Sequence, residues 1–299
     1  MAKRKANKQT LTLIAGSLGV LIIIALAFAL FSYKEAREKR AAYRARHVRV
    51  TIPEGFDTFM IGARLQKLGV IDAQSFISAC EDERFVRYLG LSGHSLEGYL
   101  FPDTYEFLKE SSAAIIVEKM VNNYKNKSQA LWDDNRRALD SLHDTLGWSS
   151  YEVLILASII EKEAQRKEEQ AIIAGVFLNR LTSTTFSPKR LQADPTLAYG
   201  CKLASSALVS CARFDGKHLG KTQRMDPQNP YNTYFIEGLP PGPISNPGLS
   251  AMTAVLKPKK HDFLYFVSRG DGSHLFSRTL DKHQQGINKY LKKIPTKTD

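Results

Sequence analysis

A stretch of 21 residues without a charged side chain, Leu11–Phe31, limits what the first part of this chain can form. A helix of that length rises about 30 Å, which matches the hydrocarbon core of a lipid bilayer. The stretch is longer than the apolar region of a usual signal peptide, and no small-residue cleavage site follows it. We therefore predict an uncleaved single-pass transmembrane helix over Leu11–Phe31, preceded by a tail of residues 1–10.

The net charge of +12 is concentrated beside that stretch. The first 50 residues hold 11 Lys or Arg and 2 Glu, a balance of +9, whereas the other 249 residues have a balance of only +3. This distribution is typical of a membrane-flanking segment rather than a phosphate-binding surface, so we expect no nucleic-acid partner. Basic residues lie on both sides of the span and by count slightly favour the reverse topology, so charge alone does not fix the orientation. Residues 32–47 alternate charged residues with alanine, which predicts a helical stalk.

Residues 48–95 have the pattern of a small module. Hydrophobic alternation, turn residues and helical spacing predict a half-buried strand, a turn and two helices, over Val48–Ile52, Pro53–Gly55, Phe59–Leu68 and Ala73–Tyr88. A strand–helix–helix unit of this size is typical of a binding module.

A larger domain is predicted over residues 96–294. We expect helices at 112–144, 150–165 and 168–182, and a buried strand at Phe263–Val267. The C-terminal third is rich in Pro, Gly and Tyr, which predicts long functional loops. Together with the small module, these elements predict an α+β fold.

The predicted helix at 150–165 is the most informative element for function. Ser149 and Glu152 form a capping-box pattern at its start, and Val153–Ile160 is apolar apart from Ser158, so the helix should be buried nearly all round. A buried helix that ends in Glu161-Lys162-Glu163 places carboxyl groups where water is scarce.

The two glutamates at that end face different ways, about 200° apart around the helix axis. Glu163 shares its face with Leu156, Ile159 and Ile160, whereas Glu161 shares its face with smaller residues. Apolar neighbours raise the pKa of a carboxyl group and suit it to general-acid chemistry near neutral pH. We predict Glu163 as the acid/base and Glu161 as a secondary candidate; the alternative is that both are solvated residues at a helix end.

Other chemistries find little support in the motifs. The chain has no HExxH, GxSxG, Walker A, GxGxxG or CxxC pattern, so we expect neither a metal nor a cofactor. The seven histidines are scattered, and each is expected to be structural.

The loops Tyr231–Tyr234 and Gly238–Ile244 offer aromatic and amide groups to a sugar-binding cleft, or serve as packing loops. Cys201 and Cys211, ten residues apart, form a local disulfide in an oxidising compartment or remain two free thiols.

Seven segments, in this order, resemble the YceG-like endolytic murein transglycosylase family. They are LEGYLFPDTY (96–105), ASIIEKEA (157–164), VFLNRL (176–181), LQADPT (191–196) with Tyr199, YNTY (231–234), GLPPGPI (238–244) with residues 246–248, and YFV (265–267). Any one is weak, but seven in order, spread over residues 48–290, are highly specific.

The resemblance implies a lyase that cuts the β-1,4 bond between N-acetylmuramic acid and N-acetylglucosamine without water. One glutamate would protonate the leaving oxygen and then help the muramic 6-hydroxyl attack the anomeric carbon, which forms a 1,6-anhydro end. Related enzymes carry Glu-Ser or Glu-Thr at this step, and Glu163-Ala164 stands there in this chain. The departure at Ala164 removes a supporting hydroxyl but leaves the acid.

The resemblance also implies a LysM-like fold for 48–95 and a catalytic domain over 96–294. It implies a cytoplasmic N-terminus, a catalytic domain outside the inner membrane, and nascent glycan strands, the membrane and wall synthases as partners. From the matching segments we expect substrate-binding residues at Glu97, Tyr99, Gln192, Asp194, Thr196, Tyr231, Asn232, Thr233, Tyr234, Pro240 and Asn246. Two other functions remain open at this point: a non-catalytic peptidoglycan-binding scaffold, and a muramidase that admits water.

Overall fold

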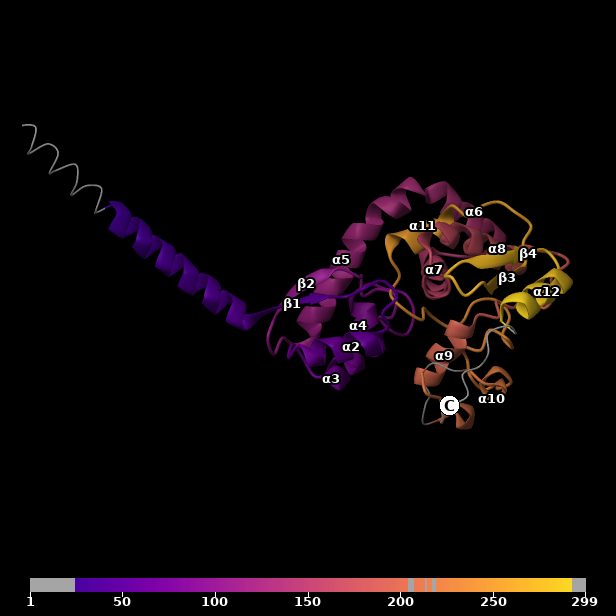
Figure 1. Ribbon diagram of the computed structural model, residues 1–299, viewed down its shortest axis with the longest axis horizontal. Coiled ribbons are helices and arrows are strands. Elements are labelled where there is room, and N and C mark those ends of the chain that lie inside the picture. Colours follow the sequence, from indigo (N-terminus) through magenta and orange to yellow (C-terminus); the bar gives the residue numbers. More distant parts are fainter. Residues whose placement is uncertain (1–24, 204–206, 213, 217–218, 292–299) are drawn as a thin grey trace, which may run out of the picture. The chain divides into compact units, whose positions relative to one another are not determined.

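The computed structural model describes residues 25–203, 207–212, 214–216 and 219–291 (Figure 1). Residues 11–24 of the predicted transmembrane helix lie outside this part. Within it, no helix combines the length and the apolar character needed to cross a membrane. Helices and two small sheets make up the described chain, which confirms a mixed α+β fold.

The chain divides into two compact units. The first contains the residues up to Val48 together with Glu106–Lys109. Its described part begins with a helix over 25–46, so residues 32–46 of the predicted stalk are helical, and His47 is the first residue of a strand. Tyr43 near the end of this helix stacks on His47 with ring centroids 3.7 Å apart and donates a hydrogen bond to the Glu106 carboxylate at 3.0 Å.

The second unit begins with three helices, α2 (Thr58–Lys67), α3 (Ala73–Cys80) and α4 (Glu83–Tyr88). The strands β1 (His47–Thr51) and β2 (Thr104–Leu108), which pair with each other, have residues in both units. Aspartates cap all three helices: Asp57, Asp72 and Asp82 each accept a hydrogen bond from a backbone N–H in the first turn. The single helix predicted over Ala73–Tyr88 is wrong, because the Asp82 cap starts a new helix.

The helix predicted over 112–144 is also two helices, α5 (Ala113–Asp134) and α6 (Arg136–Leu146). Asn135 separates them with a non-helical backbone, and its side chain donates to the Leu131 carbonyl oxygen at 2.7 Å. Gly147 ends α6 in the left-handed conformation, with φ of 72°.

The core of the second unit is built on α7 (Ser150–Glu163), which packs against α8 (Gln170–Thr182) and α11 (Leu249–Leu256) (Figure 1). The predicted capping box at Ser149 and Glu152 is present, and Val153–Ile160 is fully buried, which confirms both predictions. Ser158, the polar residue within this apolar run, forms hydrogen bonds with the Pro-rich loop. Its hydroxyl accepts a hydrogen bond from the Ile244 N–H at 3.0 Å, and its carbonyl accepts one from Ser245 at 3.1 Å, so it anchors the Pro-rich loop.

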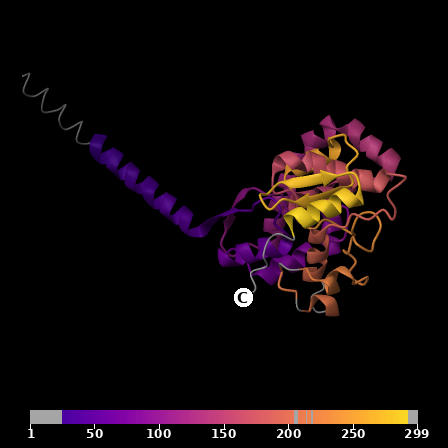
Figure 2. The same cartoon turned by 45° about the vertical axis from the view of Figure 1, so that its right-hand side comes forward.

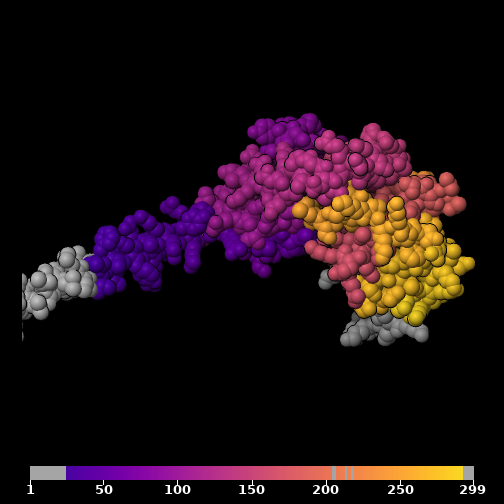
Figure 3. All heavy atoms as spheres, turned by 90° about the horizontal axis from the view of Figure 1, so that it is seen from above, coloured from indigo at the N-terminus to yellow at the C-terminus, as the bar shows by residue number. Residues whose placement is uncertain are grey.

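The C-terminal segment folds as a hairpin and a helix, which lie side by side in two views (Figures 1 and 2). The elements are β3 (Tyr265–Ser268), β4 (His274–Ser277) and α12 (Leu280–Tyr290), and the antiparallel register pairs Tyr265 with Ser277 and Ser268 with His274. The strand was predicted two residues too early and as buried; in β3 only Val267 is buried. In the space-filling view, the C-terminal third lies against the segment around residues 150–190 (Figure 3).

Several elements of the C-terminal half were not predicted. They are the strand β4, the α-helices α9 (Asp194–Leu203), α10 (Lys221–Arg224), α11 and α12, and two short 3₁₀ helices at Lys167–Glu169 and Val209–Cys211. Of the two alternatives for the cysteines, the structure shows the disulfide Cys201–Cys211, packed with Leu208 and Phe214.

Candidate active site

Glu163 is the last residue of α7 and lines a cavity of about 460 Å³. Four parts of the chain meet there: the ends of α7 and α8, the start of α9 with the YNTY loop, the β3–β4 hairpin, and α12. The polar groups that line the cavity with Glu163 are Arg180, Gln192, Asp194, Tyr234, Ser268, His274, His283 and Gln284. Tyr265, Leu280 and Ile287 supply much of its apolar surface. The cavity is therefore lined by both polar and apolar groups.

Burial raises the pKa of the Glu163 carboxyl group to about 8, and the nearby Asp194 carboxylate adds to the shift, while Arg180 opposes it. No described residue donates a hydrogen bond to this carboxyl group. The position of Glu163 at a helix C-terminus also raises its pKa, since the helix dipole disfavours an anion there. At neutral pH Glu163 is thus mainly protonated and free to give its proton to a ligand.

Arg180, on α8, is the cation whose charge lowers the pKa of Glu163. Its guanidinium donates to the backbone carbonyl oxygens of Leu264, at 2.6 Å, and Leu191. The rings of Phe186 and Tyr265 lie against it, each centroid 5.5 Å away. Burial lowers the pKa of Arg180 to about 10, which leaves it charged at neutral pH. A fixed cation of this kind stabilises the carboxylate that Glu163 becomes after proton transfer.

Asp194 and Gln192 also line the cavity. Arg224 pairs with the Asp194 carboxylate at 2.8 and 3.2 Å, and the Tyr234 hydroxyl donates to it at 2.7 Å. Gln192 adopts a left-handed backbone, with φ of 52°, while its N–H donates to the Thr233 carbonyl at 3.0 Å. A non-glycine residue in this conformation carries strain that is often found at ligand sites.

The YceG-like family model matches residues 30–289. The chain belongs to the YceG-like family. It is 31% identical over 259 residues to a Bacillus subtilis protein named endolytic murein transglycosylase, with 81% of this chain aligned to 65% of that protein. It is 28% identical over 264 residues to a Streptococcus pneumoniae protein of the same name, with 81% of this chain aligned to 44% of that protein. The matches therefore span less than two thirds of the length of these curated relatives.

A solved structure agrees with this family membership. A putative YceG-like protein from Listeria monocytogenes superposes on the chain with a TM-score of 0.64 at 32% sequence identity. The superposition covers 79% of this chain and 75% of that one.

In this YceG-like chain, four of the residues predicted from the sequence meet at the cavity: Glu163, Gln192, Asp194 and Tyr234. Three others lie directly behind them and are fully buried: Thr196, Asn232 and Thr233. The hydroxyls of Thr196 and Thr233 bond each other at 2.9 Å, and the Asn232 amide donates to the Asp226 carbonyl at 2.7 Å. These three side chains hold the loop that presents the cavity wall.

Glu97 and Asn246 form a separate buried cluster. One Glu97 oxygen accepts from the Thr58 N–H at 2.9 Å and the Tyr199 hydroxyl at 3.0 Å, and the other accepts from the Asn246 amide at 2.7 Å. Burial raises the pKa of Glu97 to about 7, and the neighbouring Asp57 carboxylate adds to the shift. This carboxyl group joins α2, α9 and the loop after Pro243.

Three further predicted residues lie among aromatic rings or in the Pro-rich loop. Tyr99 is buried, with ring centroids 5.2 Å from Tyr124 and 6.2 Å from Tyr151. Tyr231 is half-buried and meets Tyr199 at 5.1 Å, and Pro240 is buried. None of the three is among the residues that line the Glu163 cavity.

Glu161 is half-buried on another side of α7. Its carboxylate accepts a hydrogen bond from the Gly248 N–H at 3.2 Å, and burial raises its pKa. Because it is bonded to backbone and does not line the Glu163 cavity, it fits a structural role better than Glu163 does.

Sequence reasoning missed Arg180 and His274 as cavity residues. Arg180 stood inside the VFLNRL segment, where helix spacing alone did not show that it faces Glu163. His274 was grouped with the scattered histidines, because nothing in the sequence brings β4 to the end of α7.

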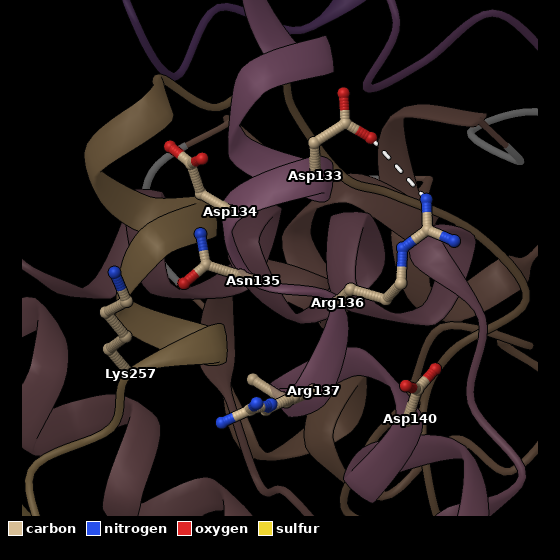
Figure 4. A pocket seen from close by; sticks show the side chains of 8 residues that line it. Asp133, Asp134, Asn135, Arg136, Arg137, Asp140 and Lys257 are labelled. Carbon is tan, nitrogen blue, oxygen red and sulfur yellow. Dashed lines mark ion pairs between the residues drawn. The ribbon is translucent and has the colours of Figure 1, made fainter.

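A hollow of about 520 Å³ at the turn from α5 to α6 is a useful contrast (Figure 4). Its carboxylates are exposed and lie among Arg136, Arg137 and Lys257, and Asp133 forms an ion pair with Arg136 at 3.7 Å. Unlike Glu163, these carboxylates are in contact with water, and an exposed ion pair contributes little. Among the described residues, no group of three or more His, Cys, Asp or Glu converges on a metal-binding position.

Proposed function

We propose that this protein is an endolytic lytic transglycosylase that cleaves peptidoglycan glycan strands and leaves 1,6-anhydromuramic ends. The observation that carries the proposal is the Glu163 carboxyl group, which has a pKa near 8, no hydrogen-bond partner among the described residues, and an open cavity before it. The names of the relatives from B. subtilis and S. pneumoniae support the same activity.

In the proposed reaction, Glu163 gives its proton to the glycosidic oxygen as the bond to the anomeric carbon breaks. The new carboxylate is stabilised by Arg180. The muramic 6-hydroxyl attacks the anomeric carbon, and its proton restores Glu163 to the acid form. Because the nucleophile belongs to the substrate, one strong acid suffices, unlike the two carboxylates of ordinary glycosidases.

The cavity walls suit a sugar strand. Gln192, Asp194 and Tyr234 provide hydrogen-bonding groups, and Tyr265 provides an aromatic ring. Sugars present hydroxyl and acetamido groups at their edges and C–H groups on their faces, and this arrangement serves both. Glu97 and Asn246 act on the same reaction indirectly, by fixing the segments around the site.

The remaining parts of the proposal concern organisation and location. Residues 48–95 form a LysM-like module, supported by the order β1–α2–α3–α4, and residues 96–294 form the catalytic domain. Leu11–Phe31 anchors the chain in the inner membrane with residues 1–10 in the cytoplasm, so that the enzyme meets nascent strands and their synthases outside. The support for the anchor is the uncharged 21-residue stretch.

Muropeptide analysis tests the activity. Purified protein is incubated with glycan strands, and products of the unmutated protein, Glu163→Gln and Glu161→Gln are compared by mass spectrometry. We expect anhydro ends from the unmutated protein and Glu161→Gln, and none from Glu163→Gln. Ends heavier by about 18 Da, one water, would identify a muramidase. Binding without cleavage by the unmutated protein would identify a scaffold.

A further inference from the structure

His274 brings a further proton-accepting group to the Glu163 cavity. It is the first residue of β4, and its side chain is 8% exposed. Glu169 holds it with both carboxylate oxygens: one accepts from the His274 backbone N–H at 3.1 Å, and the other lies 2.7 Å from Nδ1. Since an ionised carboxylate only accepts hydrogen bonds, Nδ1 is the nitrogen that carries a proton in this pair.

The other ring nitrogen, Nε2, is left for a ligand. It has no hydrogen-bond partner among the described residues, and it is not one of the side-chain atoms sealed from solvent without a partner. The rings of Phe266 and Phe276 pack against the imidazole at 5.4 and 6.3 Å, which restricts its rotation. The imidazole is therefore fixed with a lone pair available at the cavity.

His94 shows that pairing with a glutamate does not by itself make such a site. Its Nδ1 lies 2.8 Å from Glu83, almost the same geometry, but its side chain is 80% exposed. An exposed pair of this kind is solvated and contributes little. The difference at His274 is that the pair is buried and opens into the cavity that holds the acid.

We propose that Nε2 of His274 accepts the proton of the attacking 6-hydroxyl and passes it to Glu163. This inference rests on the proposed function. Glu163 first protonates the glycosidic oxygen as the C1–O bond breaks. The O6–C1 bond then forms, the O6 proton moves to Nε2, and the imidazolium, stabilised by the Glu169 carboxylate, returns that proton to the Glu163 carboxylate. Both groups end the cycle as they began it.

His274→Asn separates this role from a structural one. The asparagine amide can still donate to Glu169, as Nδ1 does, but places nothing at the position of Nε2. We expect kcat to fall about 100-fold with little change in KM or melting temperature. The share of products with a water-derived reducing end should rise, because an unassisted 6-hydroxyl competes less well with water. His94→Asn is the matched control and should change neither kcat nor the product ratio.

A second variant and a binding measurement cover the case in which His274→Asn folds poorly. In Glu169→Gln, the amide donates to Nδ1, which moves the ring proton to Nε2 and removes the acceptor. We expect loss of kcat and a ¹⁵N histidine spectrum with the opposite tautomer. In the folded Glu163→Gln protein, an unmodified wall-glycan tetrasaccharide should shift the His274 Nε2 resonance.

The results that overturn the inference are distinct from those that overturn the function. A folded His274→Asn with unchanged kcat and product ratio, or a His274 Nε2 resonance that saturating tetrasaccharide does not move, refutes the role of His274 and leaves the enzyme. Absence of anhydro ends from the unmutated protein refutes the proposed function itself.

Discussion

Glu163 and Glu97 are two buried carboxyl groups with raised pKa values, about 8 and about 7, and they have opposite surroundings. Glu97 accepts three hydrogen bonds from Thr58, Tyr199 and Asn246. Glu163 accepts none from the described residues and faces a cavity. A raised pKa alone therefore does not mark a catalytic acid. The two sites differ in whether the carboxylate oxygens already accept hydrogen bonds from other groups of the protein.

The sharpest test of this comparison is Glu163→Gln. We expect kcat/KM for anhydro-end formation to fall about 10³-fold, since glutamine cannot donate the proton that general-acid catalysis requires. The measurement is the rate of anhydro-muropeptide release, with the melting temperature as a check on folding. Glu161→Gln, two residues away on the same helix, should keep activity within a few-fold. Loss of activity in Glu161→Gln, with activity kept in Glu163→Gln, would identify Glu161 as the general acid instead.

Glu97→Ala should act on stability. The substitution leaves the Thr58 N–H, the Tyr199 hydroxyl and the Asn246 amide buried without an acceptor, and we expect a loss of about 3 kcal/mol in the free energy of unfolding. Urea denaturation monitored by circular dichroism measures this. Tyr199→Phe, which removes one donor together with its bond, should cost about 1 kcal/mol. A fully stable but inactive Glu97→Ala would place Glu97 in the chemistry instead.

The pH dependence of activity should follow Glu163. Its carboxyl group must be protonated to act, so kcat/KM should be near its maximum below pH 8 on this limb and fall about tenfold per unit above it. The pH–rate profile of the unmutated protein on isolated glycan strands measures the limb. A decline that begins near pH 5 would mean that the carboxyl group is solvated in the free enzyme.

The smallest expected effect is on the pH dependence of stability. The folded protein keeps Glu163 protonated up to about pH 8, whereas the unfolded chain ionises it near its ordinary pKa of about 4.3. This contribution to stability is complete below about pH 4 and is lost as pH rises towards 8. Glu163→Gln should therefore gain stability relative to the unmutated protein, by about 1 kcal/mol more at pH 6.5 than at pH 5.5. A constant difference in melting temperature over that range would contradict it.

The sequence predicts those parts of the fold and the site whose contacting residues lie close together along the chain. The cap and apolar run of α7 are local, so Ser149, Glu152 and the burial of Val153–Ile160 were predictable, and with them the bias towards Glu163. The breaks at Asp82 and Asn135 were missed because apolar spacing continues through them. Arg180, His274 and the bonds of Glu97 depend on contacts between distant segments, which no local pattern contains.

The Glu97–Asn246 hydrogen bond spans 149 residues, and the cavity before Glu163 is lined in part by α12, which begins at Leu280. During synthesis, the helix that carries the acid is complete long before the segments that surround it exist. Folding must close these long loops before the contacts are gained, which makes the last steps slow. A nascent chain that lacks α12 would carry the acid helix without all of the residues that line the cavity, so the proposed site is incomplete until α12 has been synthesised.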